Sequence, residues 1–271
     1  MTIHVRAPAT TANIGPAFDV AGAAFDLWNE MTVDEANGPV DDDHLAIRAF
    51  ARFASPQNYS FSFVDRIPRE RGLGSSAAVV ALGLVAGAIA AGAEPTADEL
   101  LAEGLPLEGH ADNLAAALVG GVTFSWDGRI ARIADEMPAA AIAVVPRTRV
   151  KTAEARASLP QTVLHADAVF TAGRAALLGA ALARGDESLF AAAAADRLHE
   201  PYRAAHAPHF TEISEALPDG ALGATISGSG PTVIVWARPG RNGDVAVALA
   251  DRFPEHDVMH LSISSIGAGP V

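Results

Sequence analysis

A chain of 271 residues can form one large domain or two smaller domains that share a cleft, and its 50% hydrophobic residues exclude wholesale disorder. The absence of cysteine excludes disulfides, thiolate metal sites and cysteine nucleophiles. The net charge of −13, with Lys151 as the single lysine, argues against nucleic acid and anionic lipid as partners.

The N-terminal residues 1–6 lack the charged head and apolar run of a signal peptide. The longest uncharged apolar stretch, residues 77–93, is short for a membrane span and diluted with alanine and glycine, which favours a buried helix. We therefore expect a cytoplasmic protein with no membrane partner.

Alternating hydrophobicity predicts the strands of the first half of the chain. Residues 3–7 alternate like a half-buried strand, which Pro8 is expected to end because proline cannot donate to a sheet. Residues 59–64 alternate with strict period two and predict a second strand. The other expected elements are a strand at 31–33, helices at 44–54 (after three aspartates), 77–93 and 96–102, a helix that follows 113 and ends at the glycines 120–121, and a hairpin of 122–126 and 129–133.

Pro138 precedes a buried strand at 140–145 that we expect to open a second domain. Strands and helices then mix without regular βαβ alternation, which predicts an α+β fold with domains 1–135 and 136–271. The expected later elements are helices at 163–183, 186–197 and 243–252 and strands at 223–227, 232–236 and 257–263.

Residues 68–78, Pro-Arg-Glu-Arg-Gly-Leu-Gly-Ser-Ser-Ala-Ala, form a glycine-rich loop between an expected strand and a long expected helix. The two glycines let backbone amides approach a ligand, and the positive end of the helix favours an anion. A bare Gly-x-Gly-Ser is more often a turn with a serine cap, but the flanking elements and the two arginines favour phosphate. A Walker loop is excluded, and no Gly-x-Gly-x-x-Gly opens a βαβ unit.

Polar residues gather in two further segments. Residues 7–19, Ala-Pro-Ala-Thr-Thr-Ala-Asn-Ile-Gly-Pro-Ala-Phe-Asp, contain Asn13 and Asp19, which by themselves are ordinary turn formers. Residues 107–113, Leu-Glu-Gly-His-Ala-Asp-Asn, lie between apolar helices. One histidine is too few for a transition-metal site, whereas a carboxylate beside phosphate oxygens suits Mg²⁺. A small-residue turn at 223–232 joins two expected strands.

In this order and spacing, the phosphate loop and these two segments resemble the GHMP kinase superfamily over essentially the whole chain. Residues 7–19 and 108–113 resemble the members that phosphorylate L-homoserine. The resemblance implies a two-domain GHMP kinase fold, with an N-terminal domain like part of ribosomal protein S5, a C-terminal ferredoxin-like domain and ATP in the cleft between them. It also implies Mg²⁺ as a cofactor, direct transfer to the side-chain hydroxyl of L-homoserine in threonine biosynthesis, and leaves a homodimer open.

The resemblance assigns roles to individual residues. Ser76 and Glu108 are implied to position Mg²⁺, with Glu103 as the rival ligand. The residues implied to bind ATP are Pro68, Arg69, Glu70, Arg71, Gly72, Leu73, Gly74, Ser75, Ser76, Ala77 and Ala78. Those implied to surround homoserine are Asn13, Asp19, His110, Asp112, Asn113, Arg156 and Arg203, and those implied to act in catalysis are Asn113, Asp112, Ser76 and Glu108.

These residue types suit a zwitterionic acceptor. A carboxylate pairs with arginine forks and an ammonium pairs with a carboxylate such as Asp19. Asn113 cannot accept a proton at neutral pH and is expected to orient the hydroxyl, which leaves Asp112 open as a base. His44 and Leu45 depart from the family, whose members usually carry an asparagine near adenine.

Three other readings remain open from the sequence. The first is a GHMP kinase that acts on shikimate, pantoate or mevalonate. The second is a non-catalytic sensor of nucleotide or amino acid. The third, an RNA-binding module of the S5 type, conflicts with the charge.

Overall fold

The computed structural model describes residues 2–36 and 40–271 and arranges their strands in two antiparallel sheets. Both sheets are accompanied by helices, which confirms the expected α+β class. The first sheet has the order β10-β1-β2-β4-β5, with β3 paired to β2, and consists of β1 (Thr2–Ala12), β2 (Ala21–Glu35), β3 (Tyr59–Val64), β4 (Val122–Trp126), β5 (Arg129–Ala134) and β10 (Gly269–Pro270). The second has the order β7-β8-β6-β9 and consists of β6 (Ala140–Val145), β7 (Ala221–Ile226), β8 (Val233–Ala237) and β9 (Asp257–Leu261).

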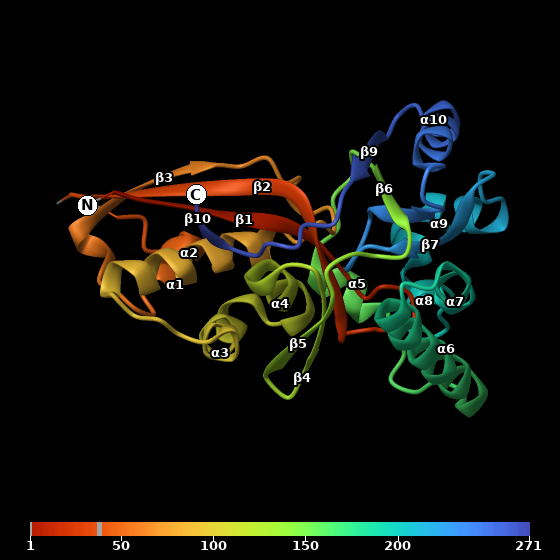
Figure 1. The fold of residues 1–271 in the computed structure, drawn as a ribbon, viewed down its shortest axis with the longest axis horizontal. Coiled ribbons are helices and arrows are strands. Elements are labelled where there is room, and N and C mark those ends of the chain that lie inside the picture. Colours follow the sequence, from red (N-terminus) through yellow and green to blue (C-terminus); the bar gives the residue numbers. More distant parts are fainter. Residues whose placement is uncertain (1, 37–39) are drawn as a thin grey trace.

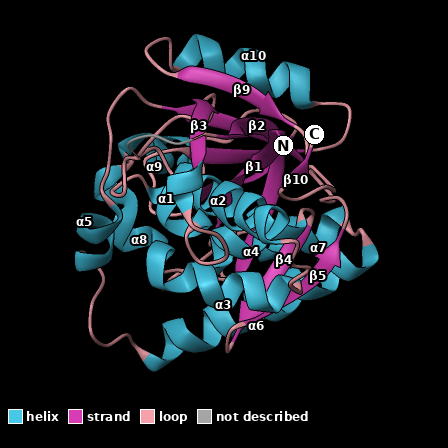
Figure 2. Cartoon of the chain, turned by 90° about the vertical axis from the view of Figure 1, so that its left-hand side faces the viewer, coloured by secondary structure: helices cyan, strands magenta, loops and turns pink. Residues whose placement is uncertain are grey.

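The two sheets lie toward opposite ends of an elongated molecule (Figure 1). Four helices cover one face of the first sheet, as both views show (Figures 1 and 2); they are α1 (Leu45–Phe50), α2 (Ser75–Ala91), α3 (Ala97–Glu108) and α4 (Ala111–Val119). The remaining helices are α5 (Thr152–Ala157), α6 (His165–Arg184), α7 (Glu187–Ala193), α8 (Glu200–Arg203), α9 (Pro208–Glu215) and α10 (Asn242–Arg252). Helices α7 to α10 contact strands of the second sheet, whereas α6 packs on α7 and on β5 of the first sheet.

The C-terminal segment returns from the second sheet to the first (Figure 1). Ile263 forms a bridge with Phe25, and Pro270 pairs with Val5, so that β10 borders β1. The division of the chain at residues 135 and 136 stays a prediction.

The expected end of the first strand at Pro8 was wrong. β1 continues to Ala12, and its register with β2 shifts between Pro8 and Ala9. An irregularity at this point accommodates the missing proline N–H without ending the strand. The strand expected at residues 31–33 is part of the fifteen-residue β2, which begins ten residues earlier, at Ala21.

Two helices of the first half differ from their expected bounds. α3 runs to Glu108 rather than 102 and contains Pro106, so Glu108 ends a helix instead of lying in a loop. α1 is shorter than expected, and no side chain caps its N-terminus at His44. The other expected helices and strands are present within a few residues, whereas α5, α8 and α9 were not predicted.

One large core cluster joins the two halves. It contains Phe25 and Leu82 from the first half and reaches Ile234 and Trp236 of β8 in the second. α6 is long and apolar enough to cross a membrane by length and composition alone, but Leu178 and other residues on its inner face belong to this cluster. The two halves therefore share one continuous hydrophobic core.

Candidate active site

The glycine-rich loop lies between β1 and the turn that joins β7 to β8. Gly74 has φ +65°, and a Cβ atom there would lie 1.8 Å from Thr10 Oγ1. Gly72 has φ +81°, and its Cβ would lie 2.3 Å from the Ser227 carbonyl oxygen. Only glycine combines this backbone conformation with such close approach. α2 begins at Ser75 with no side-chain cap, so its first amide groups remain available for an anion.

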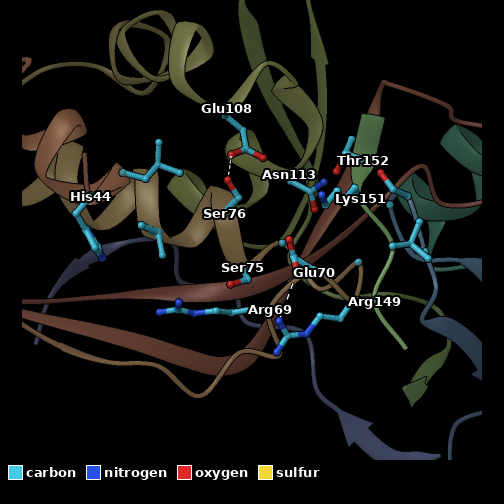
Figure 3. Close-up of a pocket in the computed structure, with 18 of the residues that line it drawn as sticks. His44, Arg69, Glu70, Ser75, Ser76, Glu108, Asn113, Arg149, Lys151 and Thr152 are labelled. Atoms are coloured by element: carbon cyan, nitrogen blue, oxygen red, sulfur yellow. Dashed lines mark hydrogen bonds and ion pairs between the residues drawn. The ribbon is translucent and has the colours of Figure 1, made fainter. Parts of the chain in front are cut away.

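The loop borders a cavity of about 660 Å³ (Figure 3). Figure 3 shows the cavity extending from His44 on one side, past Ser75 and Ser76, to Asn113, Lys151 and Thr152 on the other. The expected nucleotide residues Arg69, Glu70, Gly72, Gly74, Ser75 and Ser76 line it, together with Asp43, His44, Leu45, Val79, Glu108, Asn113, Arg149, Val150, Lys151, Thr152, Gly228, Ser229 and Gly230. Pro68, Arg71, Leu73, Ala77 and Ala78, also expected there, are not among the lining residues.

Ser76 and Glu108 meet at the rim of this cavity. The Ser76 hydroxyl donates to Glu108 Oε2 at 2.5 Å. Burial raises the pKa of Glu108 to about 7, the Ser76 hydrogen bond lowers it, and Asp112 raises it further. Glu103 instead forms an ion pair with Arg52 and does not line the cavity, so the geometry favours Glu108 over its rival.

The pair fits Mg²⁺. A hydroxyl and a carboxylate are hard oxygen donors, and a cation would relieve the cost of burying the Glu108 charge. Among residues 2–36 and 40–271, no group of three or more His, Asp or Glu side chains could hold a metal. Phosphate oxygens and water would therefore supply the rest of the coordination shell, as is usual for Mg²⁺.

Asn13 and Arg203 meet at the carbonyl oxygen of Gly228. Asn13 Nδ2 and Arg203 Nη1 each donate to this oxygen at 2.9 Å. Asn13 has φ +65°, and its Oδ1 accepts from the backbone N–H of Asp19 at 2.8 Å. Arg203 is 1% exposed, and burial lowers its pKa. The turn between β7 and β8 thus fixes two of the expected acceptor residues.

Asp19 and Arg156 form a bidentate ion pair at the mouth of the same region. The shortest of its contacts is 2.8 Å, from Arg156 Nη2 to Asp19 Oδ1. Phe18 lies beneath both arginines, with its ring centre 5.5 Å from Arg156 Cζ and 4.9 Å from Arg203 Cζ. The two guanidinium groups and the Asp19 carboxylate therefore lie close together around Phe18.

His110 and Asp112 complete the acceptor residues at the start of α4. Burial is the main cause that lowers the pKa of His110 and raises the pKa of Asp112 to about 6. The charges of Asp19, Arg156 and Arg203 also shift the pKa of each group, which means that these three residues lie near it. Asn113 stands between the acceptor and phosphate regions, where its Oδ1 accepts from the Thr10 hydroxyl at 2.8 Å.

Several residues of the site were missed by sequence reasoning. Thr10 orients Asn113, Gly228 joins Asn13 to Arg203, and residues 149–152 line the cavity opposite the loop. A signal for Thr10 was present in the segment 7–19, but only the fold reveals its contact with α4. The carbonyl of Gly228 carries no side-chain signal at all.

A cradle of backbone amides in a cleft between two α+β halves, with carboxyl and amide side chains at its rim, defines a nucleotide-dependent small-molecule kinase. The family model described as GHMP kinases N terminal domain matches residues 44–121, and that described as GHMP kinases C terminal matches residues 178–255. The chain belongs to the GHMP kinase family, which confirms the expected two-domain kinase fold.

Relatives in sequence and structure agree with this assignment. A homoserine kinase of Clavibacter michiganensis is 38% identical over 92% of this chain and 87% of its own length. One of Streptomyces coelicolor is 39% identical over 87% and 84%. The crystal structure of a homoserine kinase from Cytophaga hutchinsonii superposes with a TM-score of 0.89 at 28% identity, covering 100% of this chain and 97% of the other.

Gly74→Ala is expected to lower stability by about 1–3 kcal/mol and to weaken MgADP binding, because alanine strains the backbone and displaces Thr10. Gly92→Ala is the matched control, since Gly92 ends the same helix at φ +64° with nothing within 4 Å. Thermal melts and calorimetric titration with MgADP measure both effects. Equal losses in the two variants would show that the contact with Thr10 is unimportant.

Proposed function

We propose that this chain transfers the γ-phosphoryl group of ATP to the side-chain hydroxyl of L-homoserine, giving O-phospho-L-homoserine and ADP. The observation that carries the proposal is the cluster of opposite charges that Asp19, Arg156 and Arg203 form near Asp112, the residue before Asn113 of the phosphate cavity. The names of the sequence relatives support the same substrate. As a biosynthetic kinase of this kind, the protein is expected to work in the cytoplasm.

The unpaired hydrogen-bond donors of the site favour an acceptor with a carboxylate. The Nε groups of Arg156 and Arg203 are buried and have no hydrogen-bond partner in the part of the chain that the structure describes. Buried donors of this kind are rare unless a ligand or water satisfies them. A carboxylate can accept from both guanidinium groups, and such charge-assisted bonds are strong and directional.

Asp19 suits the ammonium group of the same ligand. Its ion pair with Arg156 is well exposed, with side-chain exposures of 41% and 39%, so substrate can replace it at small cost. The negative charges of Asp19 and Asp112 then face the ammonium while the arginines face the carboxylate. Shikimate, pantoate and mevalonate carry a carboxylate but no ammonium group, so they would give Asp19 and Asp112 no positively charged partner, which disfavours them as acceptors.

The nucleotide fits along the glycine-rich loop, with its base toward His44 and its phosphates at the start of α2. The His44 ring stacks on Phe63 with 4.2 Å between ring centres. Ser76 and Glu108 would hold Mg²⁺ beside the phosphates. When bound, this ion would neutralise charge on the phosphate oxygens.

The reaction needs alignment and charge neutralisation more than covalent assistance. Asn113 donates its amide N–H groups toward the hydroxyl, because its Oδ1 is occupied by Thr10. As the hydroxyl oxygen bonds to the γ-phosphorus, the bond to the bridging oxygen of ADP breaks. The hydroxyl proton leaves to a phosphoryl oxygen, to water or to Asp112.

Asp112→Asn tests the last of these destinations. We expect the KM for homoserine to rise about 10- to 100-fold, because a charged hydrogen-bonding partner of the ammonium is lost. The kcat is expected to stay within about tenfold, since a loose transition state gains little from a base. A kcat loss above about 10²-fold at unchanged KM would instead identify Asp112 as the base. Initial rates over a homoserine series separate the two.

A coupled ADP-release assay tests the function itself. Homoserine, threonine, shikimate, pantoate and mevalonate are compared at equal concentration, with mass spectrometry to detect the phosphorylated product. The expected result is turnover with homoserine at least about 10²-fold above every other acceptor. Greater turnover with one of the others would reassign the substrate. Nucleotide binding without turnover of any acceptor would make the chain a sensor.

A further inference from the structure

Lys151, the only lysine of the sequence, lies in the wall of the nucleotide cavity. It directly precedes α5 and lines the same space as Ser76 and Asn113. Figure 3 shows it at the side of the cavity away from His44, and Asn113 and Thr152 line the cavity as well. The lysine therefore lies at the end where the phosphate and acceptor regions meet.

Both arginines of the cavity wall are already paired. Arg69 forms an ion pair with Asp65, and Arg149 forms one with Glu70 at 3.6 Å. The backbone carbonyl of Lys151 accepts from the N–H groups of Glu154 and Ala155, but its side-chain ammonium group makes no ion pair or hydrogen bond with any residue in the ranges 2–36 and 40–271. Of the lysine and arginine residues that line this cavity, within those ranges, Lys151 is thus the one whose side chain pairs with no carboxylate.

The acidic surroundings of Lys151 indicate that its unpaired charge has a role in binding an anion. The chain carries 32 acidic residues against 19 basic ones, so a surface lysine has many carboxylates with which to pair. The cavity wall itself contains Asp43, Glu70 and Glu108, which oppose the binding of a polyphosphate. An anion entering this cavity requires positive charge, and Lys151 supplies it at the acceptor end.

We propose that Lys151 is the cation that contacts the transferred phosphoryl group. This inference rests on the proposed function, because it requires a nucleoside triphosphate in the cavity. The ammonium group donates hydrogen bonds to the γ-phosphoryl oxygens while the bond to ADP breaks and the bond to the acceptor oxygen forms. Its flexible stem and compact charge suit it to follow a group that moves between two partners.

Lys151→Met tests the proposal, because methionine keeps the length of the stem and removes the charge. The kcat is expected to fall about 10²- to 10³-fold, as for the loss of one preorganised donor at a developing charge. Affinity for MgATP should fall, whereas affinity for MgADP, which lacks the γ-phosphoryl group, should stay within about threefold. Lys151→Arg, which restores a cation, should recover at least about tenfold in kcat over the methionine variant.

Arg238→Met is the matched control for net charge, since this exposed arginine pairs with Glu187 at 3.1 Å, outside the cavity. Its kcat should remain within about twofold of the parent. Thermal melts of all variants exclude misfolding as the cause. A Lys151→Met kcat within about threefold of the parent, an equal loss of MgATP and MgADP affinity, or no recovery in Lys151→Arg would overturn the proposal.

A failure of the homoserine proposal can be distinguished from a failure of the Lys151 proposal. If the parent chain turns over an acceptor other than homoserine, the substrate assignment fails. The Lys151 proposal is then tested by measuring the kcat of the parent and the Lys151 variants with that acceptor. If it turns over none, the difference between MgATP and MgADP affinity still tests the contact with the γ-phosphoryl group.

Discussion

Glu108→Gln is expected to lower kcat by about 10²- to 10³-fold at saturating ATP and homoserine, the cost of losing one preorganised charge at the transferring group. The amide keeps the shape of the side chain but cannot carry the negative charge that favours Mg²⁺ over water. The Mg²⁺ concentration needed for half-maximal activity should rise as well. Coupled ADP-release rates over a Mg²⁺ series measure both quantities.

Glu103→Gln is the control for this variant. Glu103 lies on the same helix and pairs with Arg52 at the surface, where an ion pair contributes little. Its kcat and Mg²⁺ dependence should stay within about twofold of the parent. If Glu103→Gln lost activity while Glu108→Gln retained it, the assignment of the magnesium ligand would be reversed.

The raised pKa of Glu108 also predicts a dependence on pH. Because burial moves this pKa from 4.5 to about 7, the carboxyl group contributes stability that is complete below pH 4.5 and lost as the pH rises through 7. The metal-free protein should therefore lose melting temperature across this window, and Glu108→Gln should reduce the loss. Activity should change in the opposite sense, since the ionised carboxylate holds Mg²⁺. Thermal melts without Mg²⁺ test the expected fall in melting temperature between pH 5 and 8, and rate profiles over the same range test the expected rise in activity.

The sequence was most informative where the functional residues follow one another in the chain. The loop 68–78 and the segment 107–113 could be identified because their glycines, serines and carboxylates stand together in the chain. The helix boundaries near these segments were harder to predict, because α3 continues through Pro106 and ends at Glu108. Tertiary packing overrides the local signal of one proline.

Contacts between distant segments could not be predicted in this way. The Thr10 hydroxyl meets Asn113 across 103 positions, and Asn13 meets Gly228 across 215. Neither contact leaves a spacing or periodicity in the sequence. That the Lys151 side chain has no partner among the described residues is likewise a property of the whole fold, because it depends on where every nearby carboxylate lies.

Arg203→Met is expected to raise the KM for homoserine by about 10²- to 10³-fold, the cost of removing one partner of a buried charged pair. Arg203 is almost fully buried, and its Nε has no partner among the described residues, so substrate carboxylate is the natural acceptor. The fold should survive, since Asn13 still donates to the Gly228 oxygen that Arg203 leaves. Arg197→Met, which breaks an exposed pair with Asp167, is the matched control.

A substrate analogue makes this prediction specific to the carboxylate. Homoserinol carries a CH2OH group in place of the carboxylate and keeps the ammonium and the reacting hydroxyl. The parent enzyme should prefer homoserine strongly, whereas Arg203→Met should treat the two acceptors within about tenfold of each other, since the discriminating charge pair is gone. If the variant lost the same factor with both acceptors, Arg203 would act on the shape of the site rather than on the carboxylate. Because Arg156 also faces this space, the double variant should lose little more than Arg203→Met alone if both arginines hold one carboxylate.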